Sequence, residues 1–420
     1  MNPARARWAY LLLSFVMNVM LGSAYSWSVF TGPLRTAYGS DSFTAFTALL
    51  PFAVALGTFS LGMVFAGKFV DRHGPRKVAM LGGALVSVGY MLSYLVAYAP
   101  AHTVWPVITL VLTYGVVMGA GIGFSYNPPI PTATRWFPDR RGLATGIVVM
   151  GYGLSPLFTA PLADALISWY GVPNTFLILG VLFLLVLVPL GSLLKFPPAD
   201  WKAPEPKGGS KRTWTPITES DRRMVLRSPA FWTAWFLYAI GTAGGFMVIG
   251  NAKPIAMEIG LVTGWLAVAA VQVMAVFNSI GRPIFGRSSD AFGPKWTLMV
   301  MFIVLFGAMT LLSLSSTWIP LYVGIAFTGI VFGGFLAVMP ALATYFFGQK
   351  NLGSNYGLLF TGYGLGAIVA TFAAGILHDT YGSYVPAFYV GIALSLVGLV
   401  VSLLVRPPKP VAPEGAVAKT

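Results

Sequence analysis

The sequence predicts an all-α membrane protein with twelve transmembrane helices arranged as two pseudo-symmetric six-helix bundles. Three observations predict this fold class: the composition, the length of the apolar runs, and a repeat between the two halves. The 420 residues are 56% hydrophobic and only 9% charged, whereas roughly 25% of the residues in a soluble domain are charged. A soluble globule would lack the polar residues to cover its surface, which excludes soluble enzymes. The absence of cysteine excludes disulfide scaffolds and thiol catalysis.

Twelve apolar runs are each long enough for a helix to cross a bilayer, which takes about 20 residues. Backbone polar groups that face lipid must be satisfied within the segment, so we expect these runs to be helical. The predicted spans are 8–30, 44–69, 78–98, 104–128, 143–166, 172–194, 231–255, 264–286, 296–315, 318–346, 355–377 and 384–405. The first run lacks a clear small-residue cleavage site, and we interpret it as a retained helix and not as a signal peptide.

The positions of the cations predict the orientation of the chain. Of the 26 Lys and Arg residues, all but Arg35, Lys253 and Arg282 fall at the N-terminus, in the tail or in alternate loops on one side. Cytoplasmic loops carry an excess of Lys and Arg, so this side is predicted to be cytoplasmic, with both termini inside and the chain in the inner membrane. The net charge of +14 therefore reflects topology in the lipid bilayer, and we expect no nucleic-acid partner.

Residues 196–229 form the predicted cytoplasmic linker between an N-terminal bundle, 1–195, and a C-terminal bundle with a short tail, 230–420. The linker is rich in Pro, Gly and charged residues, which is typical of an exposed segment. Its last part, 217–226, fits either a short amphipathic helix on the inner leaflet or a solvated loop.

An internal repeat relates the two predicted bundles. The stretch 67–76 (GKFVDRHGPR) matches 286–295 (GRSSDAFGPK) at an offset of 219, and 146–154 (GIVVMGYGL) matches 357–365 (GLLFTGYGL) at an offset of 211. A duplicated six-helix unit predicts a binding site between the bundles, near the middle of the membrane.

The stretch 67–76 carries the pattern Gly-x-x-x-Asp-Arg-x-Gly-x-Arg, which resembles the best-known motif of the major facilitator superfamily, and 286–295 resembles its weaker second copy. The resemblance covers nearly all of 1–405 and implies the fold of that superfamily. The charged residues of the two motifs are expected to bridge neighbouring helices and close one face, not to bind the substrate. The motif residues are Gly67, Asp71, Arg72, Arg76, Gly286, Asp290 and Lys295.

Four further segments resemble a narrower branch, the oxalate/formate antiporters. They are Tyr25-Ser26-Trp27, the run RWFPDRRGLA at 135–144, the run LRSPAFW at 226–232, and Arg282-Pro283. That branch is related to the monocarboxylate transporters, which also carry Arg-Pro at the last of these positions. The resemblance implies a secondary carrier of small organic anions that works by alternating access.

Arg282 is the candidate that the residues themselves single out. A cation within a membrane helix costs several kcal/mol unless it is compensated, so it is a functional candidate by default. Its guanidinium can hold a carboxylate through two parallel hydrogen bonds, and Asn278, one turn earlier, can bind the anion or orient Arg282. The alternative is that Arg282 extends to the cytoplasmic surface. In the monocarboxylate transporters, the position of Asn278 is an Asp that pairs with the Arg. Asn is neutral, so the resemblance does not favour a proton relay at the Asn278–Arg282 pair.

Tyr363 stands where, by resemblance, the oxalate carriers have Lys. One cation in the membrane balances one negative charge, so a monocarboxylate is the expected ligand. Tyr152 is the equivalent residue of the first bundle and is predicted to face Tyr363; helix packing is the alternative for Tyr363. The other aromatic residues predicted to wall the pocket, for which packing or lipid contact is the alternative, are Tyr25, Trp27, Tyr126, Phe332 and Phe335.

No Asp or Glu lies deep within a predicted span, so the nearest candidates for proton coupling are Glu258, Asp164 and Asp41. The three His residues fall in separate loops and Cys is absent, so we expect no metal site, no cofactor and no catalytic residues. The run 119–123 (GAGIG) lies inside a predicted helix with no strand before it, which favours helix packing over nucleotide binding.

These observations predict a secondary active transporter of small monocarboxylates such as lactate or pyruvate, coupled to a proton and functional as a monomer. Arg282 is predicted to bind the carboxylate. Anion exchange of the oxalate/formate type is the first alternative. A transporter-like sensor is a more distant alternative, because the only sizeable loop is 196–229.

Overall fold

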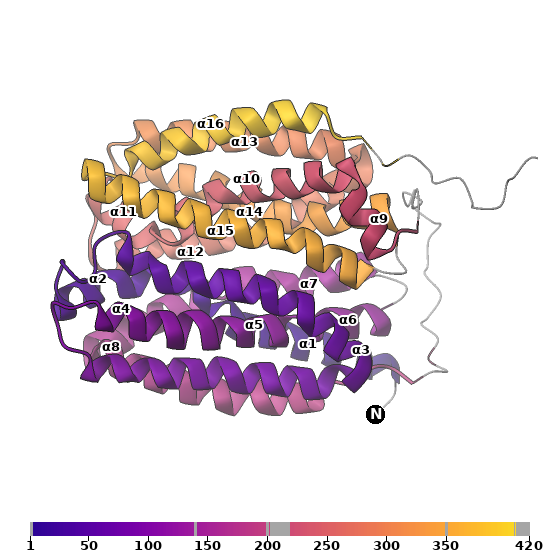
Figure 1. Ribbon diagram of the computed structural model, residues 1–420, viewed down its shortest axis with the longest axis horizontal. Coiled ribbons are helices and arrows are strands. Elements are labelled where there is room, and N and C mark those ends of the chain that lie inside the picture. Colours follow the sequence, from indigo (N-terminus) through magenta and orange to yellow (C-terminus); the bar gives the residue numbers. More distant parts are fainter. Residues whose placement is uncertain are drawn as a thin grey trace, which may run out of the picture.

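The computed structural model of the chain describes residues 3–137, 141–198, 201, 219–348, 352–406 and 408. These residues form helices and connecting turns, with no strand among them. Figure 1 shows two groups of long helices lying side by side, the first half of the chain in indigo to magenta and the second half in orange to yellow. The predicted all-α architecture is confirmed.

The first bundle consists of short helical segments that follow one another directly along the chain and of two long helices, α3 and α8, that each turn back on themselves. Its elements are α1 (Pro3–Leu21), η1 (Gly22–Ser26), α2 (Ser28–Tyr38), η2 (Thr47–Leu49), α3 (Leu50–Ser93), η3 (Tyr94–Tyr98), α4 (Trp105–Leu110), η4 (Val111–Met118), α5 (Gly119–Tyr126), α6 (Pro129–Trp136), α7 (Arg141–Leu154) and α8 (Pro156–Leu193). The helices α3 and α8 each turn at a glycine with positive φ, Gly74 (φ 76°) and Gly171 (φ 77°). This conformation is open to glycine and strained for other residues.

The second bundle has more continuous helices, with one helix for most of the predicted spans. Its elements are α10 (Pro229–Ile249), α11 (Ala252–Glu258), α12 (Gly264–Phe292), α13 (Pro294–Leu314), α14 (Trp318–Phe347), α15 (Leu352–Tyr381) and α16 (Val385–Leu403). Together α10 and α11 cover the predicted span 231–255 and extend beyond it to Glu258.

Eleven helical segments of the described chain are long and apolar enough to cross a membrane. One of them, Ala144–Leu193, has 50 residues and would be about 75 Å long if straight, more than twice the ~30 Å hydrocarbon core. It folds back at Gly171, so it supplies two crossings. The described helices therefore account for all twelve predicted spans.

The two ends of the molecule differ in what they carry. The helix α1 begins and α16 ends at the same end, on the right in Figure 1, where α9 (Arg222–Arg227) also lies. We call this the terminal end. The opposite end carries the loops that follow α2 and α11 and is called the distal end.

The end of the linker forms a short helix, α9. Asp221 caps this helix by accepting a hydrogen bond from the Met224 N–H at 2.8 Å, and Val225 is fully buried in the protein. The segment is therefore helical from Arg222, with Val225 packed against the protein and Leu226 exposed. Residues 202–218 of the linker lie outside the described residues.

The glycines of 119–123 pack helices against each other, as predicted. A Cβ at Gly121 would lie 2.5 Å from the Val86 nitrogen, and one at Gly123 would lie 2.7 Å from the Phe59 carbonyl oxygen. Only residues without a side chain allow so close an approach.

Candidate functional site

The two bundles meet along two seams that repeat the sequence symmetry. Ser279 on α12 donates a hydrogen bond to the Met150 carbonyl on α7 at 3.4 Å. Ser60 on α3 donates to the Phe360 carbonyl on α15 at 2.9 Å. The two serines are 219 positions apart, the offset of the first sequence repeat. The duplication is therefore preserved in the contacts between the halves.

Glycines of the second repeat bring these helices together. A Cβ at Gly153 would lie 2.9 Å from Arg282 Nη2 and 3.0 Å from Ser279 Oγ. At the equivalent position of the other seam, a Cβ at Gly364 would lie 2.6 Å from Ser60 Oγ. Glycine is thus needed at both places for close approach of the backbone.

Arg282 lies at the first of these seams, between the bundles. Its side chain is 3% exposed, so it does not extend to the surface. One guanidinium nitrogen, Nη1, donates to the Val149 carbonyl of α7, and Nη2 lies 3.5 Å from Asn278 Oδ1. Both partners are uncharged, and Arg282 forms no ion pair within the described part of the chain. Burial of a charge is costly unless a counter-charge accompanies it, so the site has the electrostatics of an anion receptor.

Tyrosines surround the guanidinium and join the bundles. The hydroxyls of Tyr25 on η1 and Tyr363 on α15 form a hydrogen bond across the interface. The Tyr25 ring packs edge-on against Tyr152, with centroids 4.9 Å apart, and lies 6.0 Å from Phe332. Tyr25 therefore contacts both members of the predicted facing pair, Tyr152 and Tyr363.

Four tyrosine hydroxyls lie within the electrostatic reach of the cation, those of Tyr25, Tyr126, Tyr152 and Tyr356. Tyr126 and Tyr152 have ring centroids 5.2 Å apart, and the charge of Arg282 acts on both of their hydroxyls. The Tyr152 hydroxyl is buried without a hydrogen-bond partner among the described residues. It is a donor that a bound anion could use.

Two of the predicted wall residues lie away from this cluster. Trp27 donates its ring N–H to the Ala48 carbonyl at 2.8 Å and packs 4.5 Å from Tyr114 inside the first bundle. Phe335 packs 5.3 Å from Phe302 inside the second bundle. Their contacts are those of core residues.

Sequence reasoning missed several aromatic residues that the structure brings to the centre. Phe360 stacks on Tyr363 at 4.5 Å, Phe246 lies 4.9 Å from the same ring, and Phe59 lies 5.3 Å from Tyr126. A phenylalanine in an apolar run carries no signal of its own. For Phe360, the one available signal is its three-residue spacing from Tyr363, which places both residues on one helix face.

The aromatic rings nearly fill the centre in this conformation. A cavity of about 10 Å³ lies beside Tyr25 and Asn278, which is room for about one water molecule. A small carboxylate needs more space, so its entry requires the two bundles to move.

The gating motifs are only partly visible. The side chains of Asp71 and Asp290 lie outside the described residues. Arg72 and Arg76 are exposed, and Lys295 donates to the Leu403 carbonyl at the end of α16 at 2.8 Å. A Cβ at Gly67 or Gly286 would meet only ordinary contacts, at 3.9 and 3.8 Å.

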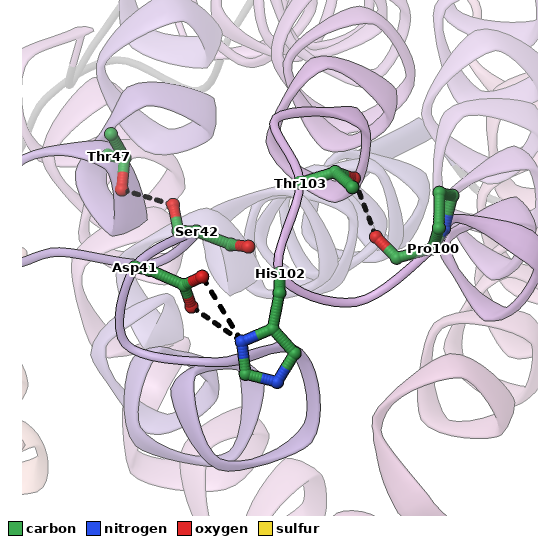
Figure 2. Close-up of polar contacts among 6 residues, drawn as sticks. All are labelled: Asp41, Ser42, Thr47, Pro100, His102 and Thr103. Carbon is green, nitrogen blue, oxygen red and sulfur yellow. Dashed lines mark hydrogen bonds and ion pairs between the residues drawn. The ribbon is translucent and has the colours of Figure 1, made fainter.

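The three candidates for proton coupling all lie at the distal end. Asp41 pairs with His102 at 2.9 Å, and Figure 2 shows this pair within the loops that follow α2 and η3. Asp164 pairs with Lys253 at 2.5 Å, and Glu258 pairs with His378 at 2.9 Å. None of these contacts includes Arg282.

The surroundings of the two loop carboxylates affect their pKa in the same direction. Desolvation by itself raises the pKa of Glu258, but hydrogen bonds from His378, the Tyr384 N–H and Ser383 outweigh it, so the pKa lies below its ordinary value. Similarly, the hydrogen bond and charge of His102 and the nearby backbone N–H groups outweigh desolvation and lower the pKa of Asp41. Both groups are therefore held in the charged form.

Asp379 is a functional candidate that the sequence did not reveal. Its carboxylate accepts hydrogen bonds from the Ala45 N–H at 2.7 Å and the Phe46 N–H at 2.9 Å. It thereby joins α15 of the second bundle to the loop before η2 of the first. With the Lys253–Asp164 pair, it forms a set of polar contacts across the distal end, which we call the distal closure.

The chain is similar in sequence and in fold to known proteins. The family model described as Major Facilitator Superfamily matches residues 8–287 and 242–419. The chain is 31% identical over 379 residues to the oxalate:formate antiporter of Oxalobacter formigenes, covering 87% of this chain and 85% of that protein. It is 28% identical to monocarboxylate transporter 10 of Mus musculus, covering 83% of this chain and 69% of that protein. A solved bacterial homologue of the human lysosomal transporter Spinster, inward-facing and unoccupied, has the same fold, with a TM-score of 0.66, 17% identity and 96% coverage of both chains.

Proposed function

Because this chain belongs to the major facilitator superfamily and is a transporter, we propose that it carries small monocarboxylates such as lactate or pyruvate by alternating access. The observation that carries the proposal is the buried Arg282, whose hydrogen-bond partners are an uncharged carbonyl and an uncharged amide. A carboxylate would supply the missing negative charge and accept two parallel hydrogen bonds from the guanidinium. The Val149 carbonyl occupies one of these donors and would have to give way.

The charge count favours an anion with one carboxylate. Tyr363 provides a hydroxyl and not a second cation, and this hydroxyl is hydrogen-bonded across the interface to Tyr25. The aromatic rings around them suit a ligand with a small apolar part beside the carboxylate. Tyr25, Tyr126, Tyr152, Tyr363 and Phe332 would form the wall of this site.

We further propose that the terminal end is cytoplasmic, that the chain works as a monomer in the inner membrane, and that a proton accompanies the anion. The excess of cations in the loops of the terminal end supports the orientation. Glu258, Asp164 and Asp41 are the proposed proton acceptors, and they would face the outside.

Uptake of labelled pyruvate into proteoliposomes, with and without an inward proton gradient, tests the proposal. Wild-type protein should accumulate pyruvate faster with the gradient, and Arg282→Gln should reduce uptake to the background of empty vesicles. Arg287→Gln is the matched control, because Arg287 is an exposed residue on the same helix. Equal uptake by Arg282→Gln and wild type would contradict the role of Arg282.

A second candidate function is anion exchange, which the similarity to the oxalate:formate antiporter favours. It predicts rapid exchange of external labelled oxalate for internal oxalate, with no dependence on the pH gradient. Exchange of oxalate without gradient-driven pyruvate uptake would replace the first proposal by this one.

A further inference from the structure

A second cavity, of about 370 Å³, lies at the distal end of the interface between the bundles. Its walls come from α2 and the segment 43–48 of the first bundle and from α11, α15 and Tyr384, just before α16, of the second. Arg35 and Lys253 both line it. These are the two cations that the sequence placed on this side of the membrane, so the distal positive charge is gathered at one cavity.

Arg35 is the cation available to a ligand there. Its side chain is exposed, and it forms no ion pair with the other described residues. Its charge acts on the hydroxyl of Tyr384, which lines the cavity from the second bundle. Lys253, in contrast, is held by Asp164 at 2.5 Å.

The acidic residue of the cavity, Glu258, forms no ion pair with Arg35 among the described residues. The Glu258 carboxylate accepts hydrogen bonds from His378 Nε2 at 2.9 Å and from the Tyr384 N–H at 3.1 Å. Both of its oxygens are thus engaged. Ser28 and Thr31 add hydroxyl groups to the wall opposite α11.

The distal cavity is next to the central one. Ile249 and Ala252 line the small central cavity, whereas Asn251 and Lys253 line the distal cavity. The junction between α10 and α11 therefore separates the two spaces, and a movement of this junction would connect them.

We propose that the distal cavity is a second anion-binding site, in which Arg35 holds a small carboxylate before it reaches Arg282. The class of ligand rests on the proposed function. The site itself rests on the cavity, on Arg35, which has no ion-pair partner among the described residues, and on the hydrogen-bonded carboxylate of Glu258. Its volume lies within the range of ordinary small-molecule sites, about 300–1,000 Å³.

The absence of cysteine from the chain permits a direct test. Met257 lines the cavity and is 47% exposed, so Met257→Cys places one thiol there. Ser316→Cys, in the exposed distal loop between α13 and α14, is the matched control outside the cavity. In proteoliposomes, each thiol is labelled from the distal side with an anionic methanethiosulfonate (sulfonatoethyl) and with a cationic one (trimethylammonium-ethyl).

The ratio of anionic to cationic labelling rates should be higher at Met257→Cys than at Ser316→Cys. Adding Arg35→Gln should lower the ratio at Met257→Cys about tenfold, as expected for one unit charge within about 6 Å in water, and Arg35→Lys should preserve it. Excess pyruvate should slow labelling at Met257→Cys only. A ratio unchanged by Arg35→Gln would overturn the proposal, and so would labelling at Met257→Cys that pyruvate does not slow.

Protection of Met257→Cys by pyruvate is measured without a change at Arg35, so it tests the distal site even if Arg35→Gln fails to fold. The labelling ratio does not require transport, so the distal site and the proposed transport function can fail separately. If the protein transports pyruvate but the labelling ratio does not change in Arg35→Gln, only the proposed distal site is wrong. If the ratio depends on Arg35 but the protein does not transport pyruvate, only the proposed function is wrong.

Discussion

Arg282 breaks the symmetry of two otherwise repeated seams. Ser60 and Ser279 occupy equivalent positions and make equivalent contacts with the opposite bundle. The residue 219 positions before Arg282 is Met63, which is buried in the first bundle. Under the proposed function, a carboxylate would find a cation on the α12–α7 seam and an apolar side chain on the other. The functional asymmetry would then come from a difference at one position of a duplicated frame.

Gly153 sets the position of that cation, and its replacement should reduce transport. A Cβ there would lie 2.9 Å from Arg282 Nη2 and 3.0 Å from Ser279 Oγ, so Gly153→Ala must displace the guanidinium. We expect pyruvate uptake to fall by about tenfold or more, since small displacements of a binding group are costly. Gly146→Ala is the control on the same helix, because nothing lies within 4 Å of its added Cβ. Unaltered uptake in Gly153→Ala would argue against this role.

For single residues, the sequence identifies charged members of the candidate site better than aromatic ones. A cation in a membrane span has few explanations, so Arg282 can be identified from the sequence alone. Trp27 and Phe335 pack in the cores of the bundles. The sequence does not show this, because an aromatic ring in an apolar helix gives no sign of which face it occupies. Asp379 escapes sequence reasoning because its partners are backbone N–H groups of another loop, which carry no sequence signal.

Among the elements, the glycine turns decide where a long apolar run becomes two helices. Gly74 (φ 76°, ψ 168°) and Gly171 (φ 77°, ψ 167°) adopt a conformation that is almost restricted to glycine. The apolar helical segment 144–193 is continuous, and the turn at Gly171 divides it between the predicted spans 143–166 and 172–194.

Replacing Gly171 should destabilise the fold without touching the site. Gly171→Ala is expected to cost about 1–3 kcal/mol of stability, from backbone strain alone, because nothing lies within 4 Å of the added Cβ. Thermal unfolding in detergent measures the effect. Gly307→Ala, inside α13 with equal space around it, should leave the unfolding temperature unchanged or raise it.

The contact of α11 with α15 should depend on pH through Glu258. Its pKa in the folded protein lies below the ordinary value of 4.5, so its stabilisation is complete above that pH and is lost as the pH falls through the lowered pKa. Glu258→Gln should therefore be less stable than wild type by about 1 kcal/mol near neutral pH, a value reduced for solvent screening.

Thermal unfolding of both proteins between about pH 3 and pH 7 tests this expectation. The two curves should converge at the acid end and remain parallel above about pH 5. In a His378→Gln background the difference should shrink, because the first partner of Glu258 is gone. A difference that grows toward acid pH would contradict the assignment.

The existence of the twelve spans could be predicted from the sequence, whereas their internal breaks could not. Apolar length and the need to satisfy backbone groups in lipid determine where a helix must run. The division of the first span into α1, η1 and α2 depends on local shifts in hydrogen bonding, which hydropathy does not record. Tyr25 lies in that break, so its contacts in the site are set by a local feature that the apolar pattern does not carry.

For the whole molecule, we expect the distal closure to determine which side the central site can open to. Asp379 accepts two backbone N–H groups from the other bundle, and hydrogen bonds to charged groups are worth about 1.5–3 kcal/mol each. Loss of one such bond would shift the balance between the closed and open forms of the distal end by about tenfold or more.

Asp379→Asn should therefore expose the centre of the protein from the distal side. The central cavity is lined by Ala275, and a thiol introduced by Ala275→Cys should react about tenfold faster with a reagent added on that side of sealed proteoliposomes. Asp41→Asn is the control, because Asp41 pairs with His102 within the first bundle. An equal rate in Asp379→Asn and its parent would refute the closure.

The burial of Arg282 among uncharged partners also has an electrical consequence. When the bundles move between the two forms, the positive charge of Arg282 moves within the electric field across the membrane. Moving one charge across the whole membrane is worth about 2.3 kcal/mol per 100 mV. The empty carrier is therefore expected to act as a voltage sensor: a sudden change in membrane potential should displace charge in it. A bound carboxylate cancels the charge of the site, so the same ligand that the carrier moves would silence that displacement.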